Sequence, residues 1–197
     1  KDYHAVLIRS ATKINDVVIR NGYNLRLIGR AGIGVDNINV GAAKKSQIVV
    51  INTPLGNTVT TAEHAISLLV SMARHIPQAT ASMKEGFWEK SRFQGTEISG
   101  KTLGIIGLGT IGSIVANRAL GLCMNVVATD PFVDEKKAKI LGAKLVSIEE
   151  LYAISDFITI HVNLSQATKY LVNKDSFKQM KTGVKLIHAA RGGIVNE

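Results

Sequence analysis

The middle of the chain carries three glycines at fixed spacing, in the segment Gly107-Leu108-Gly109-Thr110-Ile111-Gly112. An apolar run at residues 102–106 predicts a strand before this segment, and residues 111–122 predict a helix after it. In such a unit the first glycine permits a tight turn, the second lets a phosphate approach the backbone, and the third lets helix and strand pack closely. The free N–H groups at the helix start attract anions. The segment therefore predicts a site for a dinucleotide pyrophosphate.

A carboxylate follows the next predicted strand, at Asp130. At that position it can accept hydrogen bonds from the hydroxyls of an adenosine ribose, and it would repel a 2′-phosphate. This favours NAD over NADP. The alternative is a glycine-rich turn and a strand-end aspartate that bind nothing, but the strand, turn, helix and carboxylate occur in the order that the dinucleotide site requires.

The elements that must position these residues alternate along the whole chain. Strands are predicted at residues 5–8, 25–28, 48–51, 102–106, 125–129, 144–146, 157–161 and 184–188. Helices are predicted between them at residues 14–20, 40–45, 111–122 and 134–141, with Gly142 ending the last and Ser147 to Glu150 forming a capping box for a further short helix. This order is typical of α/β proteins with parallel sheets.

A helical bridge is predicted between the two alternating regions. Thr60 and Glu63 have the spacing of a capping box, and Pro77 either interrupts the helix or begins its continuation. We expect a partial substrate-binding domain of the flavodoxin-like α/β type at residues 1–59, a bridge at residues 60–90, and a Rossmann-type, doubly wound dinucleotide domain at residues 91–197.

Composition narrows the class of protein. The net charge is +9 and 46% of residues are hydrophobic. The charge is explained equally well by attraction of anionic ligands and by a lysine-rich surface, whereas the scattered basic residues do not favour nucleic-acid binding. The single cysteine, Cys123, excludes an internal disulfide framework and a cysteine-rich metal site. We expect a cytoplasmic protein without metal, and no apolar run has the length that a membrane span requires.

Several motifs resemble those of the D-2-hydroxyacid dehydrogenase family. They are Gly100-Lys101-Thr102-Leu103-Gly104, Asp130-Pro131 and Ala190-Arg191-Gly192-Gly193-Ile194-Val195. The first half resembles more narrowly the branch that acts on 3-phosphoglycerate, at Arg9-Ser10-Ala11-Thr12-Lys13, at the run from Gly29 to Asn37, at Asn52-Thr53-Pro54 and at the run from Arg74 to Ala79. The resemblance covers essentially the whole chain.

The resemblance implies hydride transfer from C2 of a D-2-hydroxy acid to NAD⁺, and it assigns roles. Arg191 matches the catalytic arginine that grips the substrate carboxylate and the C2 oxygen, for which a planar guanidinium is suited. Substrate-side positions are Arg9, Arg30, Gly32, Ile33, Gly34 and Asn57, where the loop of residues 31–34 would offer backbone N–H groups to the carboxylate. Cofactor-side positions are Gly107, Gly109, Thr110, Ile111, Gly112, Asp130, His161, Val162, Ala189, Ala190 and Arg191.

Other interpretations stay open for some of these residues. The alternative for Arg9 is an ordinary surface salt bridge. His161 resembles a general base by position, but the resemblance implies that it lines the cofactor site. His188 is expected to be a core histidine with satisfied hydrogen bonds, and His64 and His75 to be structural. Thr110, where the family often has arginine, and Val162-Asn163, where Thr-Pro is usual, put single cofactor contacts in doubt.

The resemblance also sets what is expected of the whole protein. The family's histidine–glutamate acid–base pair would lie beyond Glu197, so the 197 residues alone are expected to show little or no turnover. The substrate is expected to be 3-phosphoglycerate, at the start of serine synthesis, and the assembly a homodimer or homotetramer. The alternatives are a sibling enzyme acting on glyoxylate or hydroxypyruvate, and an NAD-sensing protein-binding module like the corepressors that share the fold.

Overall fold

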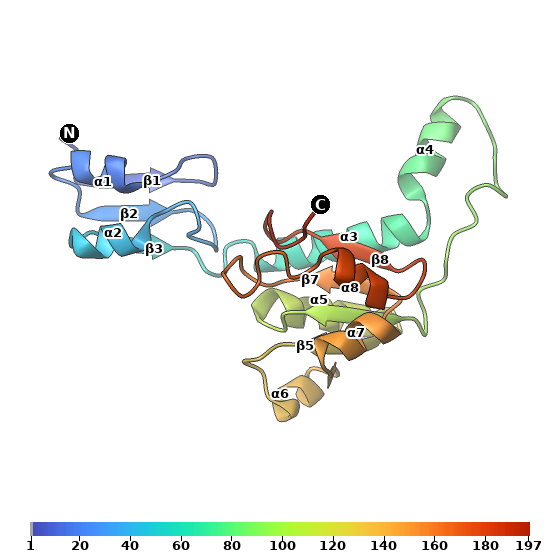
Figure 1. Cartoon of the computed structure of the whole chain (residues 1–197). Helices are drawn as coiled ribbons and strands as arrows, with labels where there is room; N and C mark the ends of the chain where they lie inside the picture. Colours follow the sequence, from blue (N-terminus) through green and yellow to red (C-terminus); the bar gives the residue numbers. More distant parts are fainter. Residues whose placement is uncertain (1) are drawn as a thin grey trace. The chain divides into compact units, whose positions relative to one another are not determined.

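The computed structural model describes residues 2–197. These residues form two compact units, one ending at Thr58 and the other running from Val59 to Glu197 (Figure 1). None of the helices in this range has the length and apolarity needed to cross a lipid bilayer.

The first unit is a three-stranded parallel sheet in the order β1 (Ala5–Ile8), β2 (Leu27–Arg30), β3 (Val49–Asn52). Helices α1 (Asp16–Asn21) and α2 (Val40–Lys45) connect the strands, and the side chains of Asn15 and Asn39 cap their N-termini. Branched apolar side chains from all these elements form one core, which comprises Ile8, Ile14, Ile19, Ile28, Ile38, Ala43 and Ile48. The expected positions of β1 and α2 are confirmed, and β2 and β3 begin two residues and one residue later than predicted.

The second unit is built around a five-stranded parallel sheet in the order β6-β5-β4-β7-β8, the strand order of a Rossmann fold. The strands are β4 (Thr102–Ile106), β5 (Asn125–Thr129), β6 (Lys144–Leu145), β7 (Phe157–Ile160) and β8 (Lys185–His188). The helices are α3 (Thr58–Ala73), α4 (Ile76–Lys84), α5 (Thr110–Gly121), α6 (Glu135–Ile140), α7 (Ile148–Ile154) and α8 (Lys174–Gln179).

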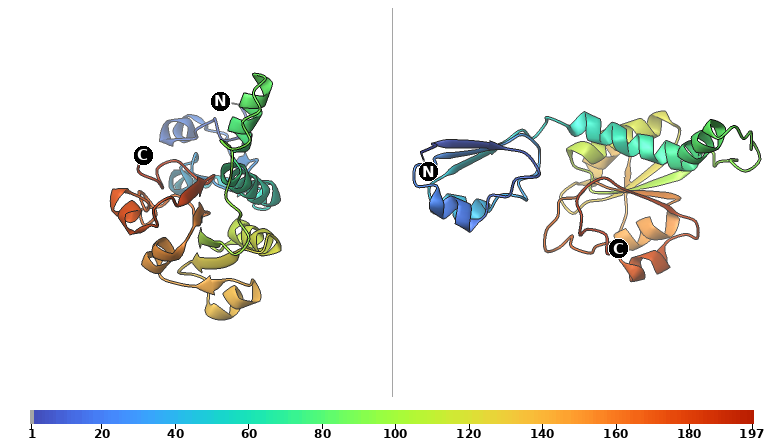
Figure 2. Two further views of the ribbon diagram at one scale, coloured as in Figure 1. Left: turned by 90° about the vertical axis from the view of Figure 1, so that its right-hand side faces the viewer. Right: turned by 90° about the horizontal axis from the view of Figure 1, so that it is seen from above.

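Helices cover both faces of this sheet (Figure 2). On one face α3, α5 and α6 pack through small residues such as Ala65, Ala116 and Ala138, which let the helix backbones approach the strands. On the other face α7 packs through Leu151 and Tyr152 onto Ile158 and its neighbours. Because both faces are buried, the strands are apolar on both sides, as in other doubly wound sheets. The expected α/β class with parallel sheets is confirmed.

Two local expectations need correction. The capping box at Thr60 is wrong, because α3 already begins at Thr58, whose side chain is buried, so Thr60 and Glu63 lie inside the helix. Ser147 does cap α7, but the Glu150 carboxylate binds Lys144 and does not complete a capping box. A complete box forms instead at α8, between Asn173 and Ser176.

Asp156 connects three elements of the second unit at the start of the sheet. Its carboxylate accepts the N–H of Thr102 at 2.8 Å and binds the Lys181 ammonium at 3.0 Å. Burial opposes ionisation, but the Thr102 hydrogen bond and the Lys181 charge outweigh it and hold the pKa of Asp156 below its usual value. The folded state therefore gains stability from the ionised carboxylate.

We predict that Asp156→Ala lowers the free energy of unfolding by about 1–2 kcal/mol at pH 7, because a charge-assisted hydrogen bond is lost. Since the folded pKa is depressed, this contribution is complete above the unfolded pKa and is lost as the pH falls through the folded pKa. Urea denaturation at pH 7 and pH 3 measures it. Asp175→Ala, which removes an exposed ion pair with Lys178, is the control and should cost less than about 0.5 kcal/mol. Equal losses in the two variants would contradict the prediction.

Candidate functional site

The cofactor-side residues lie in one row across the edge of the five-stranded sheet. Ile106 of β4 pairs in register with Thr129 of β5 and Ile160 of β7, and Ile160 pairs with His188 of β8. The next residue of each chain segment is Gly107, Asp130, His161 or Ala189. Because all four strands are parallel, these residues leave the sheet side by side at its carboxyl edge, where doubly wound folds bind ligands.

The three glycines of the turn meet three different steric conditions. Gly107 has a φ of +95°, and a Cβ there would come within 2.8 Å of the Val162 side chain. A Cβ on Gly112 would overlap the carbonyl oxygen of Gly107, whereas a Cβ on Gly109 would meet nothing within 4 Å. The open space at Gly109 lies at the N-cap of α5, beside the unpaired N–H groups of the first turn. This cradle fits the pyrophosphate of a dinucleotide.

Asp130 holds the glycine turn as well as standing at the end of β5. One carboxylate oxygen accepts the N–H of Leu108 at 2.8 Å, and the other accepts the N–H of Phe132 at 2.9 Å. Each carboxylate oxygen has a second lone pair that can accept a ligand hydroxyl. The carboxylate is therefore fixed in direction before any ligand binds, and it still has capacity for a ribose.

His161 is half-buried beside the turn and does not have the properties of a base at neutral pH. Its Nε2 lies 2.9 Å from the hydroxyl of Thr159, and its backbone N–H donates to Ile106. Burial lowers the pKa of His161 to about 4. The His161 backbone passes next to Gly107, where an added Cβ would come within 2.9 Å of the His161 carbonyl group. The neighbouring Val162 closes the same side of the turn.

Arg191 lies in the turn that follows β8. Its Nη1 donates to the carbonyl of Ala190 at 2.9 Å, and its own carbonyl oxygen lies 3.0 Å from Nε2 of His188. Ala190 packs against the cluster of Ile158, Ile160 and their neighbours, and Ile194 is fully buried there.

His188 is not the satisfied core histidine that we expected, because its Nδ1 is buried without a hydrogen-bond partner in the part of the chain described.

In the first unit, Arg30 is used to hold the loop that follows its own strand. The guanidinium is buried, donates from Nη1 to the carbonyl of Gly34 and from Nη2 to Ser10 at 3.3 Å. The Gly32 carbonyl accepts the N–H of Thr53, and the Ile33 carbonyl accepts the side chain of Asn52. The carbonyl groups of Gly32, Ile33 and Gly34 are thus all bound by protein donors, which fixes the direction of the loop.

The N–H groups of this loop are only partly available. The N–H of Ala31 donates to the carbonyl of Ile8, so the expectation that it faces a substrate is wrong. Within residues 2–197, no hydrogen bond from the N–H groups of Gly32, Ile33 or Gly34 to the protein is found. Arg9, at the end of β1, and Asn57 are exposed. The loop and Arg9 adjoin, since Arg9 follows Ile8, whose partner in register is Arg30.

Sequence reasoning missed the residues that support these groups. Asn52 holds the substrate-side loop, Ser10 binds Arg30, and Thr159 binds His161. Asn52 ends β3, Ser10 lies two residues after β1, and Thr159 lies inside β7. Between residues 2 and 197, no three His, Cys, Asp or Glu side chains form a group that could hold a metal ion.

Comparison with known proteins gives one family. Residues 66–197 match the NAD binding domain of D-isomer specific 2-hydroxyacid dehydrogenases. D-3-phosphoglycerate dehydrogenases from Archaeoglobus fulgidus, Bacillus subtilis and Homo sapiens are 52%, 46% and 44% identical to the chain over 99–100% of its length. The chain covers 37% of each of these relatives, so it spans little more than a third of their length.

Solved structures show the same fold. A D-lactate dehydrogenase from Aquifex aeolicus, complexed with NAD and lactic acid, superposes with a TM-score of 0.92 at 29% identity, over 100% of this chain and 59% of that one. An NAD-dependent formate dehydrogenase from Staphylococcus aureus in complex with NAD gives 0.89 at 33% identity, over 99% of this chain and 59% of that one. The expected Rossmann-type fold and the NAD-binding class are therefore confirmed.

We predict that alanine at Gly112 affects stability, whereas alanine at Gly109 affects NAD binding. Gly112→Ala should lower the free energy of unfolding by about 1–3 kcal/mol, because the added Cβ overlaps backbone that cannot move independently. Gly109→Ala should leave stability unchanged and weaken NAD binding at least about tenfold, because the methyl group occupies the space that the pyrophosphate would approach.

Urea denaturation and calorimetric titration with NAD⁺ measure the two effects. Gly121→Ala in the same helix, where an added Cβ also meets nothing within 4 Å, is the matched control and should bind NAD⁺ normally. Wild-type affinity in Gly109→Ala would contradict a pyrophosphate at this position.

Proposed function

Because the chain belongs to the D-isomer specific 2-hydroxyacid dehydrogenase family, we propose that the protein oxidises 3-phospho-D-glycerate to 3-phosphohydroxypyruvate with NAD⁺. The observation that carries the proposal is the row of Gly107, Asp130, His161 and Ala189 at one sheet edge, with Arg191 in the turn beyond it. The choice of substrate is supported by the similarity to D-3-phosphoglycerate dehydrogenases along the whole chain.

Each group of residues has a separate task in this proposal. Gly109 and the first turn of α5, with Thr110, Ile111 and Gly112, hold the pyrophosphate through backbone N–H groups, and the Asp130 carboxylate accepts the ribose hydroxyls. Bound NAD⁺ supplies the acceptor for the hydride that leaves C2. His161, Val162, Ala189 and Ala190 exclude water from that side, and the neutral His161 ring adds no charge beside the cofactor.

Arg191 is the proposed catalytic residue. Its guanidinium grips the substrate carboxylate and the C2 oxygen together, which fixes the face of C2 from which the hydride leaves. An always-charged guanidinium also stabilises the C2 oxygen as its proton is lost. His161 is a weak base near neutral pH, because burial lowers its pKa to about 4. We therefore propose that the C2 hydroxyl proton passes to the histidine–glutamate pair that the family resemblance implies, and not to His161.

The first unit is proposed to hold the remainder of the substrate. The N–H groups of Gly32, Ile33 and Gly34 bind the carboxylate, and Arg30 acts as the residue that fixes this loop. Arg9 is exposed and adjoins the loop, so it is the cation proposed to bind the phosphate, and Asn57 is a further polar contact. A phosphate dianion on such a guanidinium forms charge-assisted hydrogen bonds. The division into a substrate-binding part at residues 1–59, a bridge at residues 60–90 and a cofactor part at residues 91–197 belongs to this proposal.

We predict that the complete protein prefers 3-phosphoglycerate over D-glycerate by about ten- to a hundred-fold in kcat/KM, because one charge-assisted contact contributes roughly 1.5–3 kcal/mol. Arg9→Ala should remove most of this preference by lowering kcat/KM for the phosphorylated acid alone. NAD⁺ reduction followed by absorbance measures both.

Arg20→Ala is the control, since Arg20 is an exposed cation of the same unit on α1. Equal rates with the two acids in the wild-type protein would move the assignment to a sibling enzyme, such as one acting on glyoxylate or hydroxypyruvate. An unchanged preference in Arg9→Ala would leave Arg9 without the proposed role.

We also propose that the protein is a homodimer or homotetramer that assembles through the arm, defined as α4 and the segment that follows it to residue 97. In Figure 1 the arm extends away from the sheet of its own unit. It is nevertheless ordered, since Ser82 donates to Glu89 at 2.8 Å, Glu89 binds Arg92 at 2.8 Å, and Thr96 donates to Ala73. A folded arm of this kind is suited to binding a partner.

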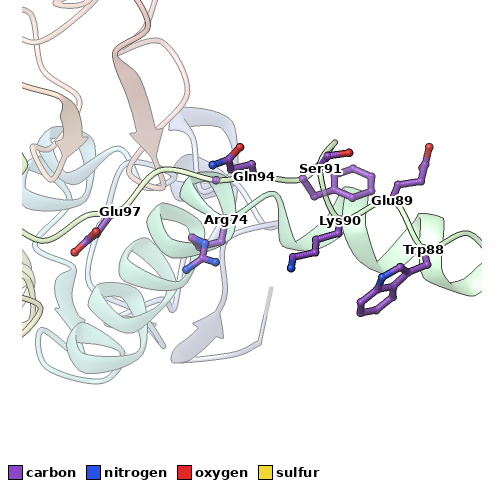
Figure 3. A pocket seen from close by; sticks show the side chains of 9 residues that line it. Arg74, Trp88, Glu89, Lys90, Ser91, Gln94 and Glu97 are labelled. Carbon is purple, nitrogen blue, oxygen red and sulfur yellow. The ribbon is translucent and has the colours of Figure 1, made fainter.

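The arm exposes apolar side chains around an open hollow. Met83, Phe87 and Trp88 are 53%, 58% and 78% exposed. In Figure 3 the side chains of Arg74, Lys90 and Trp88 point to the same side of the segment. Clustered exposed aromatic residues with an adjacent arginine are typical of protein interfaces.

A cytoplasmic location is also part of the proposal. It is supported by the single cysteine, because proteins of reducing compartments rarely depend on disulfides.

We predict that Trp88→Glu raises the dissociation constant of the assembly at least about tenfold, because a charge replaces an aromatic side chain that the proposed interface would bury. Sedimentation velocity over a concentration series measures it. Phe132→Glu is the matched control, because Phe132 is 94% exposed but lies outside the arm. A monomeric wild-type protein, or an unchanged assembly in Trp88→Glu, would contradict the proposal.

A further inference from the structure

The His188 ring makes one defined contact, to the backbone of the turn that carries Arg191. Its Nε2 lies 3.0 Å from the carbonyl oxygen of Arg191. A carbonyl oxygen only accepts hydrogen bonds, so the Nε2 must carry the hydrogen. The Nδ1 of the ring is buried without a hydrogen-bond partner within the described residues. Of the two ring nitrogens, the Nε2 therefore makes the hydrogen bond that holds the ring.

The rest of the turn is anchored on either side of Arg191. Before it, His188 ends β8 in register with Ile160. After it, the Gly193 carbonyl accepts the N–H of Tyr170 at 2.8 Å, and Ile194 is fully buried and accepts the N–H of Val172 at 3.2 Å. The Arg191 carbonyl also accepts the N–H of Ile194 at 3.4 Å, and this hydrogen bond is longer than the 3.0 Å contact with the His188 ring. The ring thus supplies the shorter of these two hydrogen bonds.

We propose that His188 is a positioning residue, whose Nε2 hydrogen bond to the Arg191 carbonyl sets the direction in which the Arg191 guanidinium meets a substrate carboxylate. The inference rests on the proposed role of Arg191. His188 itself contacts neither substrate nor cofactor in this scheme. Because it acts on one peptide group at the end of β8, its loss affects the grip on the hydroxy acid and not the pyrophosphate cradle after β4.

The geometry distinguishes two conservative replacements. The side-chain nitrogen of glutamine reaches about as far from the backbone as Nε2 of histidine, whereas the nitrogen of asparagine reaches only about as far as Nδ1. Glutamine can therefore donate to the Arg191 carbonyl and asparagine cannot. If the His188 ring only filled space, glutamine and asparagine would have the same effect on the KM for the hydroxy acid.

The test uses the complete protein with His188→Ala, His188→Asn and His188→Gln. In His188→Ala and His188→Asn we expect the KM for the hydroxy acid to rise about fivefold to tenfold, which is the effect of one neutral hydrogen bond. The dissociation constant of NAD⁺ should stay within about twofold, since no bond at the cradle changes. His188→Gln should restore the wild-type KM. His64→Gln, an exposed histidine on α3, is the matched control and should change neither constant.

Three results would overturn the inference. The first is an unchanged KM in His188→Ala, and the second is a parallel loss of NAD⁺ affinity and thermal stability in all three variants. The third is a KM in His188→Gln that is raised as much as in His188→Asn. Binding of oxalate to the NAD⁺ complex, measured by calorimetry, gives a second readout that needs no turnover and should weaken in the same variants. If the wild-type protein reduces no NAD⁺ with any hydroxy acid, the proposed function fails by itself, and oxalate binding still decides the role of His188.

Discussion

The carbonyl oxygen of Gly107 lies so close to the first turn of α5 that residue 112 has no room for a Cβ. This backbone-to-backbone contact fixes the start of the helix at the end of β4, and it therefore fixes where the unpaired N–H groups point. Asp130 depends on the same contact, because its carboxylate binds the N–H of Leu108 inside the turn. Parallel register then brings the ends of β7 and β8 alongside, and with them His161 and the turn that carries Arg191.

The two arginines that the family resemblance placed near the substrate have different environments. Arg30 is buried, and its guanidinium donates hydrogen bonds to Gly34 and Ser10. Arg30 therefore stabilises the conformation of the loop that follows β2. Arg9 is exposed at the end of the neighbouring strand and can exchange water for a ligand. Two cations on adjacent strand ends thus suit different tasks, one structural and one for binding, because burial and bonding differ while the residue type is the same.

Several local features could not be obtained from the pattern of residues. α3 begins at Thr58, whose side chain is buried, and a threonine–glutamate spacing two residues later carries no information about that burial. The capping box of α8 uses Ser176 in place of the usual glutamate or glutamine, so its spacing was not recognised. His188 was expected to be satisfied because it lies in an apolar strand, but a strand pattern gives the face of a residue and not the partners of its two nitrogens.

The sequence by itself determined the class of the fold, the position of the dinucleotide turn and the aspartate that follows β5, because glycine spacing and apolar alternation are local and periodic properties. Only the tertiary structure decided that Gly107, Asp130, His161 and Ala189 stand in one row, since that depends on strand order and register between distant segments. It also decided that Arg30 holds a loop, that the N–H of Ala31 is already bound, and that burial lowers the pKa of His161 to about 4. Hydrogen-bond partners and desolvation arise from packing, and packing is set by residues far apart in the chain.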